Sequence, residues 1–220
     1  MEPPRLNVKK FHLKELGLNY SIGMNRVKVK PDSIHLDDLM ELIDMLEARH
    51  DGAVIQFFNP HLLLSEEHLY IASYHALKGF KTGINISNNE HIELFLYLAA
   101  NRQISASIEA FGVKRGDLKR AELCYCIISE DSSIQSINEE ILESLQALPI
   151  EMDFKETTLE KIKQVMRFFE ISKDQLRSVY ASQGINPTQA KEANSDPKSM
   201  VGALIDIICE KMALLSLENA

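Results

Sequence analysis

The sequence has little of what several protein classes require. Its three cysteines, Cys124, Cys126 and Cys209, provide neither a disulfide framework nor a paired Cys-x-x-Cys metal site. The nine glycines are scattered, and no phosphate-binding glycine pattern occurs. No run of about 18 apolar residues is present, and the N-terminal segment has no uninterrupted apolar region. We therefore expect a cytoplasmic protein with no membrane segment and no nucleotide-binding loop.

Patterns for catalysis and metal binding are also missing. His68 and His75 lie seven residues apart on one expected helix, but the His-Glu-x-x-His pattern of zinc proteases is absent. Cys124 and Cys126 lie in a strand, and we interpret them as small core residues on its opposite faces. No Gly-x-Ser-x-Gly nucleophile turn occurs. We predict no catalytic residue, no metal and no cofactor.

Charge is unevenly distributed along the chain. The net charge of −8 argues against a protein that binds nucleic acid over its whole surface. Residues 1–30, however, carry seven basic side chains against two acidic ones, and residues 101–120 carry five against two. Residues 31–51 carry seven acidic side chains against one basic side chain. Local basic patches therefore remain available, although a single charged run is more often a solvated face.

Hydrophobic periodicity predicts both strands and helices. Strands are expected at residues 20–30, 53–58 and 122–129. Helices are expected at 33–50, at 65–79 with Ser65 as N-cap, at 87–99, at 104–111 and at 199–218. The helix at 87–99 is apolar nearly all round and is opened by a capping box at 87–90, and further helices are opened by capping boxes at 136–139, 157–160 and 172–175. Residues 184–199 are polar and are expected to form a loop. The fold class predicted is α/β (α+β), a small mixed sheet packed by several helices in one domain over residues 1–220.

The last helix has a broad apolar band. Its stripe comprises Val201, Leu204, Ile205, Ile208, Met212 and Leu215, and Ile207 and Leu214 widen it. One interpretation is that a partner covers the extra width. The other is a helix buried in its own domain, which periodicity alone favours by about two to one.

Three segments together resemble a known family. They are IQFFNPHLLLSEEHLYIASYHAL at 55–77, NISNNEHIELFLYLAANRQISASIEAFGVKRGD at 85–117 and VGALIDIICEKMALL at 201–215. In this order they look like the TPRKB-like kinase-binding subunits of the KEOPS complex, which installs threonylcarbamoyladenosine on tRNA in archaea and eukaryotes. We expect an archaeal member, whose region at 171–198 is longer than is usual in the family.

The resemblance implies a non-catalytic regulatory subunit that binds and activates the kinase/ATPase subunit of KEOPS and binds the tRNA 3′ CCA end. The residues it implies for the kinase interface are Val201, Leu204, Ile205, Ile208 and Met212. For tRNA we expect Lys78, Lys81, Arg102, Gln103 and Lys114, since Arg and Lys meet phosphates and Gln hydrogen-bonds bases or sugars. Arg102 and Gln103 could equally cap a helix junction.

Two alternatives from other classes remain open. A free-standing RNA-binding regulator would use the same basic residues without needing the apolar terminal helix. A small-molecule enzyme would need a pocket with ionisable residues of perturbed pKa, and His68 and His75 are the candidates for it.

Overall fold

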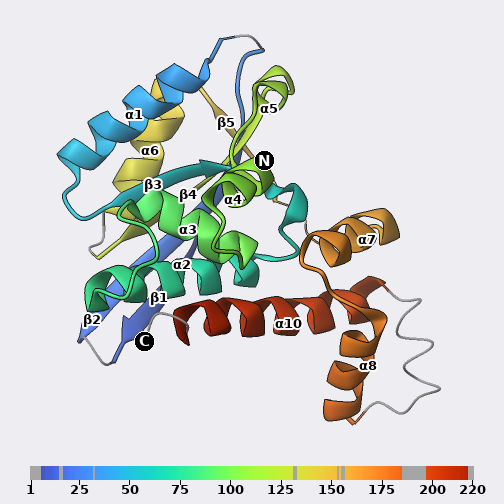
Figure 1. The fold of residues 1–220 in the computed structure, drawn as a ribbon. Coiled ribbons are helices and arrows are strands. Elements are labelled where there is room, and N and C mark those ends of the chain that lie inside the picture. Colours follow the sequence, from blue (N-terminus) through green and yellow to red (C-terminus); the bar gives the residue numbers. More distant parts are fainter. Residues whose placement is uncertain are drawn as a thin grey trace.

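A five-stranded sheet forms the middle layer of the molecule. The computed structural model describes residues 6–14, 17–31, 33–130, 133–152, 154, 157–184 and 197–217 (Figure 1). The strands are β1 (Asn7–Leu13), β2 (Leu18–Lys28), β3 (Val54–Phe58), β4 (Glu122–Ser129) and β5 (Leu148–Ile150). Their order is β1-β2-β4-β3, with β5 also paired to β2, and each of these pairs is antiparallel. The predicted α+β class is confirmed, with an antiparallel sheet where we expected a mixed one.

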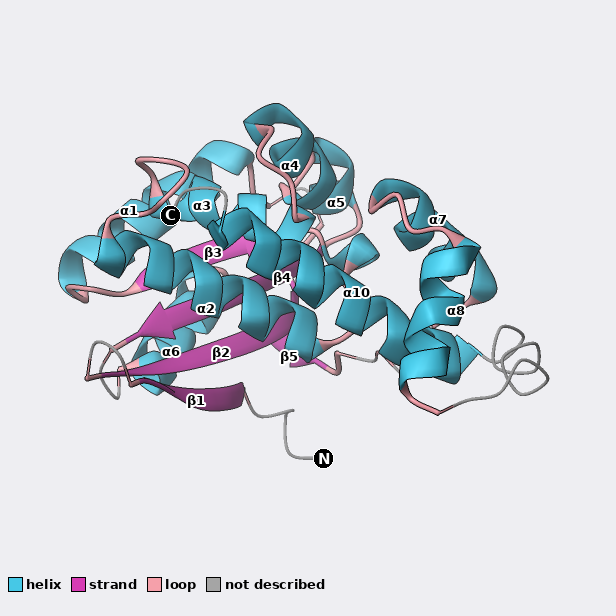
Figure 2. Ribbon diagram, turned by 60° about the horizontal axis from the view of Figure 1, so that its bottom comes forward, coloured by secondary structure: helices cyan, strands magenta, loops and turns pink. Residues whose placement is uncertain are grey.

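Helices cover both faces of this sheet (Figures 1 and 2). On one face α1 (Leu36–Arg49) and α6 (Ile134–Ser144) share a hydrophobic core with the strands. On the other face α2 (Glu66–Thr82), α3 (Glu90–Ala99) and α10 (Pro197–Leu217) share a second, larger core. The remaining helices in the described part of the chain are η1 (Pro60–Leu62), α4 (Ile104–Phe111), α5 (Arg115–Lys119), α7 (Leu159–Phe168) and α8 (Lys173–Ser182).

Strands β2, β3 and β4 are largely buried on both faces because each face carries its own helical layer. In β2, Tyr20, Ile22 and Met24 belong to the α2 side, whereas Val27 belongs to the α1 side. Our placement of Cys124 and Cys126 on opposite faces of β4 is wrong. Both lie in the core on the α2 side, because side chains two residues apart in a strand point the same way.

Helix starts follow the caps that the sequence offers, but not always at the expected residue. Ser65 caps α2 as predicted, its hydroxyl accepting from the backbone N–H of His68, and Ser172 and Gln175 form the capping box predicted for α8. The boxes expected to start at Ser87 and Ser136 are wrong, since Asn89 caps α3 and α6 already begins at Ile134. The box expected at Thr157 is wrong, since α7 has a simple N-cap at Thr158, whose hydroxyl accepts from the backbone N–H of Lys161.

Helix ends and short elements show larger differences. Helix α2 continues through Gly79, where we expected it to stop, and ends at Gly83, whose φ of 71° is a left-handed conformation that suits glycine. Strands β1 and β5 and helix α5 were not predicted. Of the loop expected at 184–199, residues 185–196 lie outside the described residues, and residues 197–199 belong to α10.

Candidate functional site

The terminal helix α10 packs along α2 and α8 (Figure 2). It runs in the same direction as α2, because Cys209 lies near Glu67 and Ser216 contacts His75. Leu204, Ile208 and Met212 are fully buried in this contact. These three predicted kinase-facing residues are therefore core residues of the chain itself.

The partly or fully exposed apolar side chains of α10 lie at its edges and at its C-terminal turn. Val201 and Ile205 are half-buried. Leu214 is 51% exposed and Leu217 is 67% exposed. A partner can therefore reach the broad apolar band only at the edge with Val201 and Ile205 and at the last turn with Leu214 and Leu217.

A polar cluster joins α10 to the two helices beneath it. The Ser216 hydroxyl lies 3.0 Å from Nδ1 of His75 on α2 and 3.2 Å from the Tyr97 hydroxyl on α3. The His75 and Tyr97 rings stack, with centroids 5.5 Å apart and planes 16° apart. Burial, and to a lesser degree the charge of Lys78, lowers the pKa of His75. His75 is therefore neutral at neutral pH and acts as a hydrogen-bonding ring.

A buried carboxylate lies close to this cluster. Glu93 on α3 is 0% exposed and accepts hydrogen bonds from the backbone N–H groups of Ile86, at 3.0 Å, and Ser87, at 2.7 Å. Burial raises the pKa of Glu93, while the two N–H donors and the charge of Arg102 oppose the rise. Glu93 thus holds the segment between α2 and α3 in place.

The structure separates the five residues expected to bind tRNA. Lys78 and Arg102 lie near the polar cluster, since their charges act on His75 and on Tyr97 and Glu93 respectively. Gln103 is exposed and occupies the N-cap position of α4. Lys81 pairs with Glu130 at 2.5 Å and Lys114 pairs with Glu109 at 2.6 Å.

These last two lysines lie at opposite ends of α2. Lys114 is near His61, which precedes α2, whereas Lys81 is 15 residues beyond Glu66, the first residue of α2. At 1.5 Å per helical residue, this separation along the axis is about 20 Å. The five residues therefore do not form one patch, and only Lys78 and Arg102 both lie near the polar cluster.

No helix in the described part of the chain is long and apolar enough to cross a bilayer. No group of three or more His, Cys, Asp or Glu side chains in the described ranges is placed to hold a metal ion.

The chain is similar to a known protein family over most of its length. A family model described as kinase binding protein CGI-121 matches residues 35–216, from the N-cap of α1 into the last turn of α10. The chain belongs to this kinase-binding family. The match includes all three segments that resemble the TPRKB-like subunits, and it supports a kinase-binding regulatory role. No curated protein matches the chain significantly.

In this CGI-121 family member, His68 is unsuited to bind a substrate. It is fully buried, with its ring edge-on to Phe111 and Phe169, and Nε2 lies 3.0 Å from the carbonyl oxygen of Leu98. Burial lowers the pKa of His68 to about 4. The perturbed pKa therefore reflects core packing, and the enzyme alternative loses one of its two candidate residues.

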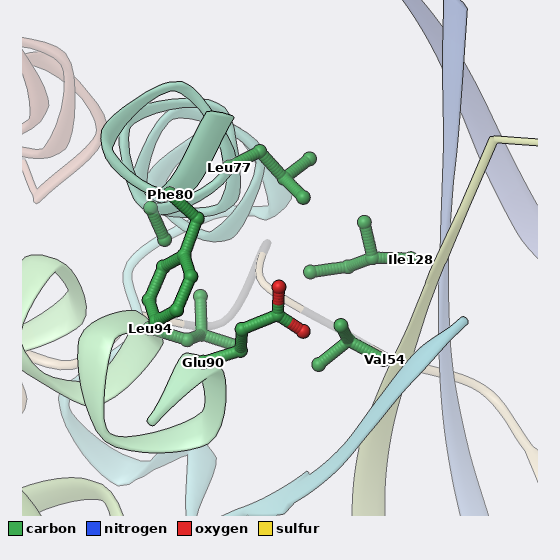
Figure 3. Close-up of a pocket in the computed structure, with 7 residues that line it drawn as sticks. Val54, Leu77, Phe80, Glu90, Leu94 and Ile128 are labelled. Atoms are coloured by element: carbon green, nitrogen blue, oxygen red, sulfur yellow. The ribbon is translucent and has the colours of Figure 1, made fainter. Parts of the chain in front are cut away.

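A small cavity between the helical layer and the sheet is likewise too small for a substrate. Leu77 and Phe80 of α2, Glu90 and Leu94 of α3, and Val54 and Ile128 of the strands surround it (Figure 3). Its volume of about 10 Å³ holds at most one water molecule. The Glu90 carboxylate is directed into this space in Figure 3, but no second ionisable group lines it.

Proposed function

We propose that this chain is the non-catalytic regulatory subunit of a KEOPS complex. In that role it binds and activates the kinase/ATPase subunit and holds the 3′ CCA end of tRNA, supporting threonylcarbamoyladenosine modification. The observation that carries the proposal is the kinase-binding family match over residues 35–216. The resemblance of the three sequence segments extends it from a kinase to the tRNA-modifying complex.

The kinase contact proposed for α10 is its exposed C-terminal turn together with the edge at Val201 and Ile205. The buried residues Leu204, Ile208 and Met212 contribute by holding the helix on α2. An Ile208→Glu variant would bury an unpaired charge and unfold this layer, so it cannot test the contact. Exposed apolar side chains at an interface are the better target, because they alter binding without altering the core.

The test is binding of the purified kinase subunit to a Leu214→Glu/Leu217→Glu variant. We expect binding to weaken by at least about tenfold, because the kinase would have to desolvate two charges. The matched control is Met40→Glu/Leu148→Glu, since these side chains are 64% and 70% exposed on other elements. Kinase binding by the α10 variant equal to that of the parent would exclude the α10 turn.

For the CCA end we propose the region around Lys78, Arg102 and Gln103. Tyr74 and His75 are half-buried rings beside Lys78 on α2, and unpaired bases stack on such rings. An Arg102→Glu variant should lose most of the preference for tRNA that retains its CCA end. Equal binding of intact and trimmed tRNA by the parent would refute this part and favour a kinase-binding role alone.

A further inference from the structure

The structure brings together two basic stretches that are far apart in the sequence. The end of β2 lies beside α5 and the start of β4, with the backbone N–H of Val29 donating to the carbonyl oxygen of Ala121 at 2.9 Å. Lys28 is opposite Glu122 in the β2–β4 pair. This end of the sheet lies away from the β1–β2 turn, near β5 and α5 (Figures 1 and 2).

A polar groove opens at this end of the sheet. Its volume is about 140 Å³. Arg26, His61, Asp117, Arg120 and Glu122 supply its charged or titratable side chains. Arg26 pairs with Glu122 at 2.5 Å, and Asp117 accepts from the side chain of Asn59 at 2.8 Å.

Two cations at the groove have no anionic partner among the described residues. Arg120 lines the groove, and Lys161 of α7 lies close enough for its charge to act on His61 and Cys124. Lys161 is half-buried, with Nζ 5.9 Å from the ring centroid of Phe154. A partly desolvated ammonium without a counter-ion gives the groove a positive potential.

The lowered pKa of His61 agrees with this positive potential. Burial lowers the pKa of His61 first, and the charges of Lys114, Lys161 and Arg120 lower it further, against the opposing charge of Asp117. Exposed basic side chains continue the positive surface beyond the groove. These are Lys28, Lys30, Arg115 and Lys119.

We infer that this groove and its basic rim, the end-of-sheet surface, bind the phosphodiester backbone of RNA, with a phosphate group seated between Arg120 and Lys161. The inference rests on the proposed function and adds a second RNA contact at a site distinct from that proposed for the CCA end. A single small anion would need only the groove. The rim of exposed Lys and Arg favours a polyanion, whose phosphates such side chains contact without reading its sequence.

The test measures binding of tRNA with and without its CCA end over a range of salt concentrations. The variant is Arg120→Gln/Lys161→Gln. The control is Lys163→Gln/Arg177→Gln, which removes the same charge from exposed positions on α7 and α8. We expect the variant to bind both RNAs about tenfold more weakly and to lower the salt slope by about one to two, while the control changes affinity less than about twofold.

The inference is overturned if the variant binds both RNAs as the control does, or if variant and control weaken binding equally. Stronger binding of a polyglutamate peptide than of tRNA, lost in the variant, would assign the surface to an acidic protein segment instead. Thermal unfolding of each variant verifies that the fold is retained. If trimming the CCA end weakens binding but the Arg120→Gln/Lys161→Gln substitutions do not, this inference alone is overturned. If the substitutions weaken binding but trimming the CCA end does not, only the proposed CCA site is overturned.

Discussion

At the scale of single residues, Glu93 connects the segment after α2 to the centre of the helical layer. Its carboxylate is the acceptor for two backbone N–H groups, of Ile86 and Ser87. Glu93→Ala would leave both donors without a partner, so we expect a loss of about 2–4 kcal/mol in the free energy of unfolding. Urea denaturation measures this loss. Glu90→Ala, an exposed site on the same helix, is the control, and equal losses in the two variants would contradict the assigned role.

His91 should make stability depend on pH. Its Nε2 lies 3.3 Å from a carboxylate oxygen of Glu47 on α1, and this partner raises the pKa of His91 although burial opposes the rise. The charges of Glu90 and Asp44 add to the rise. Because the folded pKa is raised, the stabilisation is complete below the ordinary pKa of 6.5 and disappears as pH rises through the folded pKa.

We therefore expect His91→Gln to destabilise the protein more at about pH 5.5 than at about pH 9. Unfolding by urea at the two pH values measures the difference. In a Glu47→Gln background, the same substitution should show little dependence on pH. A loss that is equal at both pH values in the parent background would show that the ion pair does not contribute.

At the scale of elements, α10 is a core helix with an exposed end. Ile208→Ala should lower the free energy of unfolding by about 2–5 kcal/mol, because it leaves a cavity at a fully buried position. Leu214→Ala should change it by less than about 0.5 kcal/mol, since that side chain is half exposed. Thermal and urea unfolding compare the two. Similar costs at both positions would mean that the terminal turn packs more tightly than its exposure indicates.

The sequence predicts the positions of helices and strands better than it predicts what packs against them. The periodicity of α1, β3 and β4 is strong because each buries a continuous apolar face, and each was placed within about three residues at either end. β1 was missed because five of its seven residues are exposed, so its polar composition follows from an edge position that only pairing with β2 reveals. Periodicity also could not show whether the α10 stripe is covered by α2 or by a partner.

Caps illustrate the same limit locally. A Ser-x-x-Glu spacing starts at Ser87, yet Asn89 caps α3, because Glu93 anchors the preceding backbone of Ile86 and Ser87. Gly79 could not end α2, since its neighbours Asn85 and Glu93 pack against a continuing helix. In both cases a residue distant from the pattern decided where the helix began or ended. Tertiary contacts, rather than propensity, set these boundaries.

At the scale of the whole molecule, the candidate site residues were the hardest to predict. Lys78, Lys81, Arg102, Gln103 and Lys114 were grouped from the family resemblance and the basic stretch at 101–120, but α2 is long enough to hold Lys81 away from Lys114. The end-of-sheet surface, in contrast, combines β2, α5 and α7, which no local pattern relates. A charged surface is a property of the fold, and strand pairing decides which charges meet.

The proposed kinase contact and the end-of-sheet surface lie on different parts of the fold, so kinase binding and RNA binding through that surface should be separable. The proposed kinase contact is the α10 turn, whose Ser216 joins the polar cluster near Arg102, whereas Arg120 of the end-of-sheet surface follows α5. We expect the parent to form a ternary complex with purified kinase and tRNA, raising the apparent affinity of the kinase for tRNA through effective concentration. Size-exclusion chromatography with kinase and labelled tRNA detects each species.

In that experiment, adding Arg102→Glu to Arg120→Gln/Lys161→Gln should leave a kinase–subunit complex without RNA. Leu214→Glu/Leu217→Glu should leave a subunit–RNA complex without kinase. Each variant is then its own control for folding, because the retained partner still requires a native surface. If either variant lost both partners while unfolding at the parent's temperature, the kinase and RNA contacts would share one surface. The assignment of kinase binding to α10 and of RNA binding to the basic regions would then be wrong.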